Sequence, residues 1–175
     1  MSELPTRINT RLAPRNYLGR NSYFVTICSY KRQNVFLDAK LSTWILDLLH
    51  SESAANSFRV QAYCLMPDHL HFLAEGMDPS SDLRHFLKSF KIKSSRRYSR
   101  QVGRALWQTR FYEHILRGPD SVETVAWYIW LNPVRKGLAS KPQDYPFVGS
   151  YSGKEMPAAW NGPEWSPPWK KSVCP

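Results

Sequence analysis

This chain lacks several features that would place it in common protein classes. Its three cysteines, Cys28, Cys64 and Cys174, include no CxxC pair, so neither a disulfide framework nor a zinc knuckle is predicted. Cys28 and Cys64 fall within apolar strand patterns and are expected to be buried thiols. No apolar run approaches the roughly 18 residues of a membrane span, and no signal peptide is recognisable. We therefore expect a reduced, cytoplasmic protein.

Acidic residues are scarce relative to basic ones. The chain has 24 lysines and arginines against 14 aspartates and glutamates, a formal net charge of +10 over 175 residues. Such a balance favours a polyanionic partner, with nucleic acid ahead of an acidic membrane surface. Aromatic residues make up 14% of the chain and offer stacking surfaces for unpaired bases. The length indicates one domain with a sizeable core.

No acidic residue lies between Asp82 and Glu113, so local pairing cannot neutralise the basic residues in this stretch. A basic run is often only a solvated helix face. Here phosphate contact is the favoured interpretation. The stretch carries Lys88, Lys91, Lys93, Arg96, Arg97, Arg100 and Arg104.

One stretch, residues 63–76, contains a His-Leu-His pattern in the second of two expected strands. A Met-Pro-Asp turn joins these strands. Alternate side chains of a strand point to the same face, so His69 and His71 lie together and the leucine between them faces the other way. Two neighbouring imidazoles form half of a metal site, although two polar residues on a solvated strand face would give the same pattern.

A second stretch has the character of a helix that ends near Pro133, because proline interrupts helical hydrogen bonding. Asp120 or Ser121 is the expected N-cap. Tyr128 and Asn132 are four residues apart and therefore share one face of the helix. A phenol and an amide brought to two histidines would place a nucleophile beside a metal ion.

These patterns resemble the single-tyrosine HUH transposases of the IS200 type, and among them the REP-associated tyrosine transposases. The resemblance covers about residues 18–151. It implies metal-dependent cleavage and rejoining of single-stranded DNA at REP-type hairpins through a 5′-phosphotyrosine. The motifs that carry it are His-Leu-His at 69–71, Tyr128 before Asn-Pro-Val-Arg-Lys-Gly-Leu at 132–138, and the segments 106–114 and 144–151.

The resemblance implies that Tyr128 is the nucleophile and that His69, His71 and Asn132 bind Mg²⁺ or Mn²⁺. All three ligands are neutral, so the ion would keep its charge and open positions for a phosphate. Imidazole ligands favour Mn²⁺ over Mg²⁺. Tyr112, which is next to an acid and a histidine, is the rival nucleophile.

The expected partner is single-stranded DNA or a DNA hairpin, bound by a monomer or a homodimer. Three other interpretations stay open: a regulator that binds DNA without cutting it, a structural metal protein and a replication-initiating nickase. The predicted DNA-binding residues are Lys88, Lys91, Lys93, Arg96, Arg97, Arg100, Arg110, Arg117, Arg135 and Lys136.

The order of expected elements predicts an α+β protein. Strands are expected at 21–30, 58–65, 69–75 and 111–116, with helices at 38–52 and 81–98. This is the antiparallel ferredoxin-like βαββαβ arrangement, with the tyrosine-bearing helix added after it.

Three regions are predicted along the chain: a basic N-terminal arm at 1–20, the HUH domain at 21–140 and an irregular Pro- and Trp-rich tail at 141–175. The arm either grips DNA or is a frayed terminus. One hypothesis is that the tail lies across the domain near the DNA groove and controls access. The alternatives are simple docking on the core and disorder.

Overall fold

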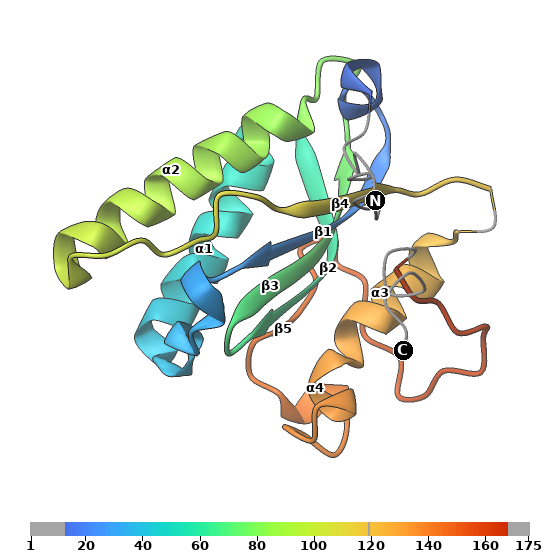
Figure 1. Ribbon diagram of the computed structural model, residues 1–175. Coiled ribbons are helices and arrows are strands. Elements are labelled where there is room, and N and C mark those ends of the chain that lie inside the picture. The colour runs from blue at the N-terminus through green and yellow to red at the C-terminus, as the bar shows by residue number, and fades with distance from the viewer. Residues whose placement is uncertain (1–12, 119, 168–175) are drawn as a thin grey trace, which may run out of the picture.

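A computed structural model describes residues 13–118 and 120–167. In that part of the chain, five strands form one antiparallel sheet in the order β4-β1-β3-β2-β5. The α+β prediction is confirmed, and β1 to β4 have the ferredoxin-like order (Figure 1). The strands are β1 Ser22–Cys28, β2 Phe58–Met66, β3 His69–Gly76, β4 Tyr112–Ile115 and β5 Val148–Gly149. The helices are α1 Ala39–Ala55, α2 Leu83–Val102, α3 Val122–Trp130 and α4 Asn132–Arg135.

The sheet separates two hydrophobic clusters, because successive residues of a strand point to opposite faces. On one face, α1 and α2 cover Leu70, Phe72 and Ala74 of β3. On the other face, α3 packs over Leu73 of β3 and Phe24 of β1. We call these the α1/α2 face and the α3 face. None of the described helices is long and apolar enough to cross a membrane.

Side-chain caps fix where the helices begin. Asp38 accepts hydrogen bonds from the first turn of α1, and Asp82 does the same for α2. For α3 the cap is Ser121, whose hydroxyl accepts from the Thr124 amide at 3.1 Å. Each cap satisfies amides that the helix itself leaves unbonded, so the prediction of Asp120 or Ser121 resolves to Ser121.

A buried acid holds α1 to α2. Glu52 is 4% exposed, and its carboxylate accepts hydrogen bonds from Lys93 and Ser89 of α2, both at 2.5 Å. Because a buried carboxylate is costly unless it is paired, these bonds are part of the core packing. Lys93, which the sequence predicts as a DNA contact, therefore has a partner inside the protein.

The last part of the predicted N-terminal arm, residues 1–20, contains a folded segment. Residues 14–17 form a short 3-10 helix, and Tyr17 is buried and donates a hydrogen bond to Glu113 of β4. Residues 13–20 therefore belong to the folded domain. The rest of the predicted arm, residues 1–12, lies outside the described residues.

The described part of the predicted irregular tail contains a 3-10 turn, Pro142–Asp144, and the short strand β5, which extends the sheet beside β2. The indole of Trp130 in α3 donates to the Gly149 carbonyl at 2.9 Å. A Cβ on Gly149 would lie 2.6 Å from the Tyr63 hydroxyl, so a larger residue here would force the Tyr63 ring to shift. Beyond β5, the described tail is irregular, as predicted.

Candidate active site

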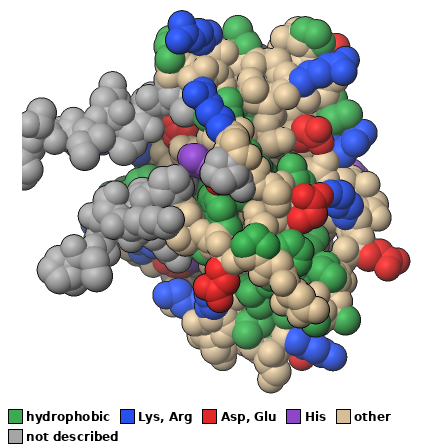
Figure 2. Space-filling view, turned by 90° about the vertical axis from the view of Figure 1, so that its right-hand side faces the viewer, with side chains coloured by type: hydrophobic (Ala, Val, Ile, Leu, Met, Phe, Trp, Pro, Cys, Tyr) green, Lys and Arg blue, Asp and Glu red, His purple; other side chains and the backbone are tan. Residues whose placement is uncertain are grey.

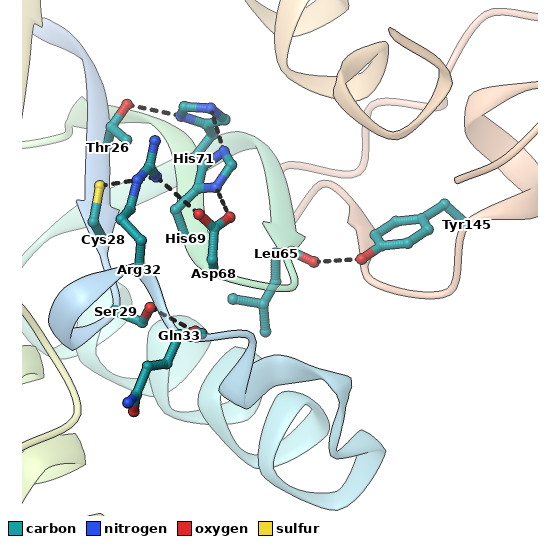
Figure 3. A network of polar contacts seen from close by, with 10 residues as sticks. All are labelled: Thr26, Cys28, Ser29, Arg32, Gln33, Leu65, Asp68, His69, His71 and Tyr145. Atoms are coloured by element: carbon teal, nitrogen blue, oxygen red, sulfur yellow. Dashed lines mark hydrogen bonds and ion pairs between the residues drawn. The ribbon is translucent and has the colours of Figure 1, made fainter. Parts of the chain in front are cut away.

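The two histidines of β3 lie side by side on the α3 face. Their Nε2 atoms are 3.0 Å apart, and the side chains are almost buried, with His69 8% and His71 7% exposed. The predicted convergence of the two imidazoles is confirmed. Figure 3 shows them within a chain of polar contacts that joins β1, β3 and the turn before β3.

A different side chain holds the second nitrogen of each imidazole. Asp68 Oδ1 lies 2.5 Å from His69 Nδ1, and Thr26 Oγ1 of β1 lies 2.7 Å from His71 Nδ1. Such contacts orient a histidine and direct its other nitrogen toward a ligand. Burial by itself would raise the pKa of Asp68, but His69 and the nearby Arg32 lower it below its ordinary value. Asp68 is therefore a carboxylate at neutral pH.

Tyr128 of α3 lies beside this pair. Its ring centroid is 6.4 Å from that of His71 and 5.8 Å from that of Phe24, which it meets edge-on. Only 4% of Tyr128 is exposed. The predicted nucleophile and the two histidines thus occupy one region of the α3 face.

Asn132 and Arg135 extend the region from α4, which begins where Pro133 interrupts the helical run. The Asn132 amide nitrogen donates to the carbonyls of Tyr128 and Ile129 at 3.0 and 3.2 Å, so its Oδ1 is the atom that would bind a metal. The Arg135 guanidinium lies 4.2 Å from the centroid of the Tyr128 ring and also donates to the Tyr128 carbonyl. A cation therefore lies directly over the predicted nucleophile, and burial lowers the pKa of Arg135.

The tail covers the tyrosine. The Trp165 ring lies 5.1 Å from both Tyr128 and Phe24, and its indole donates to Asp120 Oδ1 at 2.7 Å. The other oxygen of Asp120 is 2.8 Å from His114 Nε2. Burial would raise the pKa of Asp120, but the bonds from His114 and Trp165 lower it. Trp165 is thus held over the tyrosine by an ionised carboxylate.

A cavity of about 570 Å³ separates α3 from the tail next to Trp165. Two tryptophans, Trp127 of α3 and Trp160 of the tail, lie nearly parallel beside it with ring centroids 6.0 Å apart. Tyr128, Arg135 and Glu164 also line this space. The tail therefore meets α3 through aromatic contacts with an open, polar-edged space between them.

Tyr112, the rival nucleophile, lies farther from the histidines. It pairs with Thr26 of β1, which in turn pairs with His71 of β3, so the three residues share the α3 face. Two strand spacings separate Tyr112 from His71, roughly 10 Å. This arrangement favours Tyr128, although Tyr112 is 46% exposed and lies on the same surface.

The predicted DNA-binding residues do not all lie near the histidines. Six of them lie on α2, which covers the α1/α2 face, away from the histidines. Only Arg135 has a described contact with a predicted catalytic residue. Figure 2 views the side of the molecule at the right of Figure 1, and basic, acidic and hydrophobic side chains are interspersed there without a continuous basic surface. The α2 set is Lys88, Lys91, Lys93, Arg96, Arg97 and Arg100, and the remainder is Arg110, Arg117, Arg135 and Lys136.

Three of the α2 cations have structural partners. Lys91 donates to the carbonyls of Gln108 and Thr109 at 2.7 and 2.9 Å, and Lys93 pairs with Glu52. Arg97 lies over the Trp44 ring, 4.3 Å from its centroid. Contacts of these residues with DNA would compete with bonds inside the protein, so Lys88, Arg96 and Arg100 are the better α2 candidates.

Sequence reasoning missed three residues that contact the predicted site. Asp68 was assigned only to a turn, although its position immediately before His69 was a usable signal. Thr26 gave no signal, because its contact with His71 depends on the register between β1 and β3. Trp165 was noted only as one of several tryptophans in the tail.

The site has no dense set of metal-binding side chains. Within residues 13–118 and 120–167, no group of three His, Cys, Asp or Glu side chains is arranged to hold a metal ion. A third protein ligand beside His69 and His71 would therefore have to be of another type, and the Asn132 amide oxygen is the one that the sequence predicts.

Comparison with known proteins gives concordant matches. The family model described as "Transposase IS200 like" matches residues 19–132. A REP-associated tyrosine transposase from Escherichia coli (strain K12) is 26% identical over 137 residues, which cover 76% of this chain and 78% of the relative. A Haemophilus influenzae protein assigned provisionally to the same group is 25% identical over 166 residues, 85% of this chain and 92% of the relative.

A solved structure of a REP-associated tyrosine transposase bound to a REP hairpin is also similar to this chain. It has a TM-score of 0.62 and 20% identity and covers 85% of this chain and 82% of that chain. This similarity shows a shared fold.

Proposed function

We propose, from the premise that this chain belongs to the IS200-like transposase family, that it cuts and rejoins single-stranded DNA with Tyr128 as nucleophile. The substrate would be a hairpin of the REP type, because the solved relative of the same fold is bound to one. The observation that supports this most is the position of Tyr128 beside the paired histidines.

In the proposed reaction, the Tyr128 oxygen attacks a backbone phosphorus and forms a phosphotyrosine bond to the new 5′ end of the broken strand. The bond from phosphorus to the 3′ oxygen breaks, and this oxygen leaves as a 3′-hydroxyl after taking up a proton. Tyr128 loses its own proton to solvent or to a neighbouring base. The covalent bond conserves the phosphodiester linkage, so a second 3′-hydroxyl can reverse the step and join a new end.

The residues present fit a divalent metal ion. Imidazole nitrogens and amide oxygens are both ligands that divalent ions of this kind accept. The two Nε2 atoms are 3.0 Å apart. His69, His71 and the Asn132 Oδ1 would hold Mg²⁺ or Mn²⁺. When bound, the ion would polarise the scissile phosphate.

Arg135 would stabilise negative charge on the tyrosine side. Its guanidinium already lies over the Tyr128 ring and has further donors for a phosphate oxygen. Among the predicted DNA contacts, Arg135 is therefore the one that would act on the reaction itself. Arg110, Arg117 and Lys136 would bind flanking phosphates, and the α2 cations would bind the hairpin stem.

A DNA-binding regulator that does not cut is the second candidate. The observation that favours it is the burial of Tyr128, which is 4% exposed beneath Trp165. A phosphate cannot reach the tyrosine unless this cover moves. A regulator would use the same fold and basic surfaces without that movement.

One experiment separates the two candidates. The full chain is incubated with Mn²⁺ or Mg²⁺ and a single-stranded hairpin oligonucleotide from the flanks of its own gene, and a denaturing gel detects the covalent adduct. Tyr128→Phe and Tyr112→Phe are run in parallel. We expect an adduct that only Tyr128→Phe abolishes. Loss only in Tyr112→Phe would reassign the nucleophile, and tight binding without an adduct would favour the regulator.

A further inference from the structure

We infer that Arg32 is an additional phosphate-binding residue of the cleavage site, which holds Asp68 with one edge of its guanidinium and a DNA phosphate with the other. This inference rests on the proposed function. Arg32 lies in the short 3-10 turn after β1, Tyr30–Arg32. Neither the predicted DNA contacts nor the predicted metal ligands include it.

The backbone of this turn is unusual. Lys31 and Arg32 both have positive φ angles, 53° and 57°, a conformation that residues with a Cβ rarely adopt. Consecutive residues of this kind persist only where surrounding structure holds them, and they concentrate at functional sites. The strained backbone therefore lies at the residue whose side chain, that of Arg32, points toward Asp68 and the histidines.

Surrounding bonds fix the turn against the loop that carries Asp68. The Ser29 amide donates to the Asp68 carbonyl at 2.9 Å, and the Phe36 amide donates to the Pro67 carbonyl at 3.0 Å. The Ser29 hydroxyl also donates to the Gln33 carbonyl at 2.7 Å. The backbone that carries Arg32 is thus held beside the Asp68 loop by contacts that do not involve the Arg32 side chain.

The Arg32 guanidinium is only partly used by the protein. Its Nη1 lies 3.4 Å from Asp68 Oδ2 and 3.2 Å from Cys28 Sγ, while Asp68 Oδ1 contacts His69 (Figure 3). These described contacts engage one of its three nitrogens. The Arg32 side chain is 53% exposed. A guanidinium in this arrangement presents a second edge of parallel donors, the geometry that binds a phosphate.

The charge of Arg32 also favours a phosphate at its exposed edge. The two imidazoles are ligands when neutral, so without Arg32 the nearest fixed charge at the pair would be the Asp68 carboxylate, which repels a phosphate. Arg32 balances that charge and carries its own positive group outward. Arg135 lies over Tyr128 from a different element, α4. A strand crossing the site would thus meet one arginine at the histidine side and one at the tyrosine side.

The competing explanation is that Arg32 only braces Asp68. The two roles differ in what they change: a brace affects the histidines and hence metal affinity, whereas a phosphate contact affects DNA binding without metal. Each phosphate contact with single-stranded DNA contributes about 0.7 to the slope of log Kd against log salt concentration. The slope therefore reports whether Arg32 touches the strand.

The test measures metal-free binding of the full chain in a Tyr128→Phe background, by fluorescence anisotropy over a range of KCl concentrations with EDTA. One oligonucleotide is the hairpin with a single-stranded extension across the cleavage position, and the other is the hairpin alone. The variants are Arg32→Ala and Arg32→Lys, with Lys31→Ala as a matched control. Lys31 is the adjacent cation with the same backbone strain.

We expect Arg32→Ala to weaken binding of the extended oligonucleotide about tenfold and to reduce its salt slope by about 0.7, with no change for the hairpin alone. Arg32→Lys should keep the slope, because the charge remains, and lose part of the affinity with the two-donor edge. Lys31→Ala should behave as the parent protein. A thermal unfolding curve of each variant checks that any loss does not reflect misfolding.

Two outcomes overturn the inference, and they differ from failure of the proposed function. An unchanged slope in Arg32→Ala, together with weaker Mn²⁺ binding measured by electron paramagnetic resonance, would make Arg32 a brace. Equal losses for both oligonucleotides would place it on the stem. If the parent protein bound neither oligonucleotide, the proposed function itself would fail.

Discussion

On the α1/α2 face of the sheet, Phe72 and its neighbours are sealed under two long helices, and the buried acid Glu52 is paired with Lys93. On the α3 face, the same strand presents His69 and His71, which have polar partners and lie beneath a short helix and the tail. Along β3, residues that pack in the α1/α2 core therefore alternate with residues of the candidate site. One strand can therefore serve stability and function independently, because its alternate side chains never compete for space.

The largest expected effect comes from removing a ligand on the α3 face. His71→Asn should reduce cleavage of the hairpin oligonucleotide roughly 10³-fold, because the metal contributes several kcal/mol of charge stabilisation in such reactions. The free energy of unfolding should change little, since His71 lies outside the α1/α2 core. Single-turnover cleavage and urea unfolding of the same preparation would measure both. A large loss of stability would contradict the separation of the two faces.

The adjacent residue tests the other face. Phe72→Ala should lower the free energy of unfolding by about 3–5 kcal/mol, because it opens a cavity in a fully buried aromatic cluster. Below the unfolding transition, the variant should still form the covalent adduct. Urea denaturation monitored by circular dichroism measures the first effect, and the adduct gel measures the second. An inactive but stable variant would show that Phe72 acts on the site.

A smaller effect is expected from uncovering the tyrosine. Trp165→Ala should raise the initial cleavage rate about tenfold, equivalent to about 1.4 kcal/mol, because the ring that lies over Tyr128 is removed. Trp44→Ala is the matched control, since Trp44 packs under Arg97 on the α1/α2 face and should leave the rate unchanged. A lower rate in Trp165→Ala would mean that the tryptophan helps to bind DNA.

The smallest effect concerns the carboxylate that holds Trp165. Because the pKa of Asp120 is lowered from 3.8, its stabilising effect is present above the unfolded-state pKa and is lost as pH falls through the folded-state value. Asp120→Asn should therefore reduce the melting temperature slightly at pH 7, and the gap from the parent protein should close in acid below about pH 4. Melting curves from pH 3 to 7 measure this. A constant gap would exclude the ionised form as the cause.

The local parts of this structure could be predicted from the sequence. Strand alternation predicts the two histidines on one face of the sheet, and the i, i+4 spacing predicts Tyr128 and Asn132 on one face of a helix. Both patterns depend only on residues that are near each other in the chain. Pro133 likewise marked the end of α3. The capping residue could not be chosen between Asp120 and Ser121, since Asp120 has tertiary partners that a local pattern does not contain.

The remaining features depend on contacts between distant segments. The role of Thr26 follows from strand register, and β5 forms only because the tail returns to the edge of β2. The α2 cations up to Arg97 were correctly expected to lie on one helix, which runs on past its predicted end at residue 98 to include Arg100. The sequence did not show that this helix covers the face away from the histidines. Charge clustering along a helix says how basic a surface is and not where that surface lies.

The burial of Cys64 has a practical consequence. Cys64 lies in β2 between His71 of β3 and Val148 of β5, and burial raises the pKa of its thiol. It should therefore resist alkylating reagents while β5 and the tail are in place, and react when they lift away. Cys28, buried at the end of β1, supplies an internal reference in the same molecule. The rate of alkylation at Cys64, compared with that at Cys28, would therefore measure how often the site opens. No engineered probe would be needed.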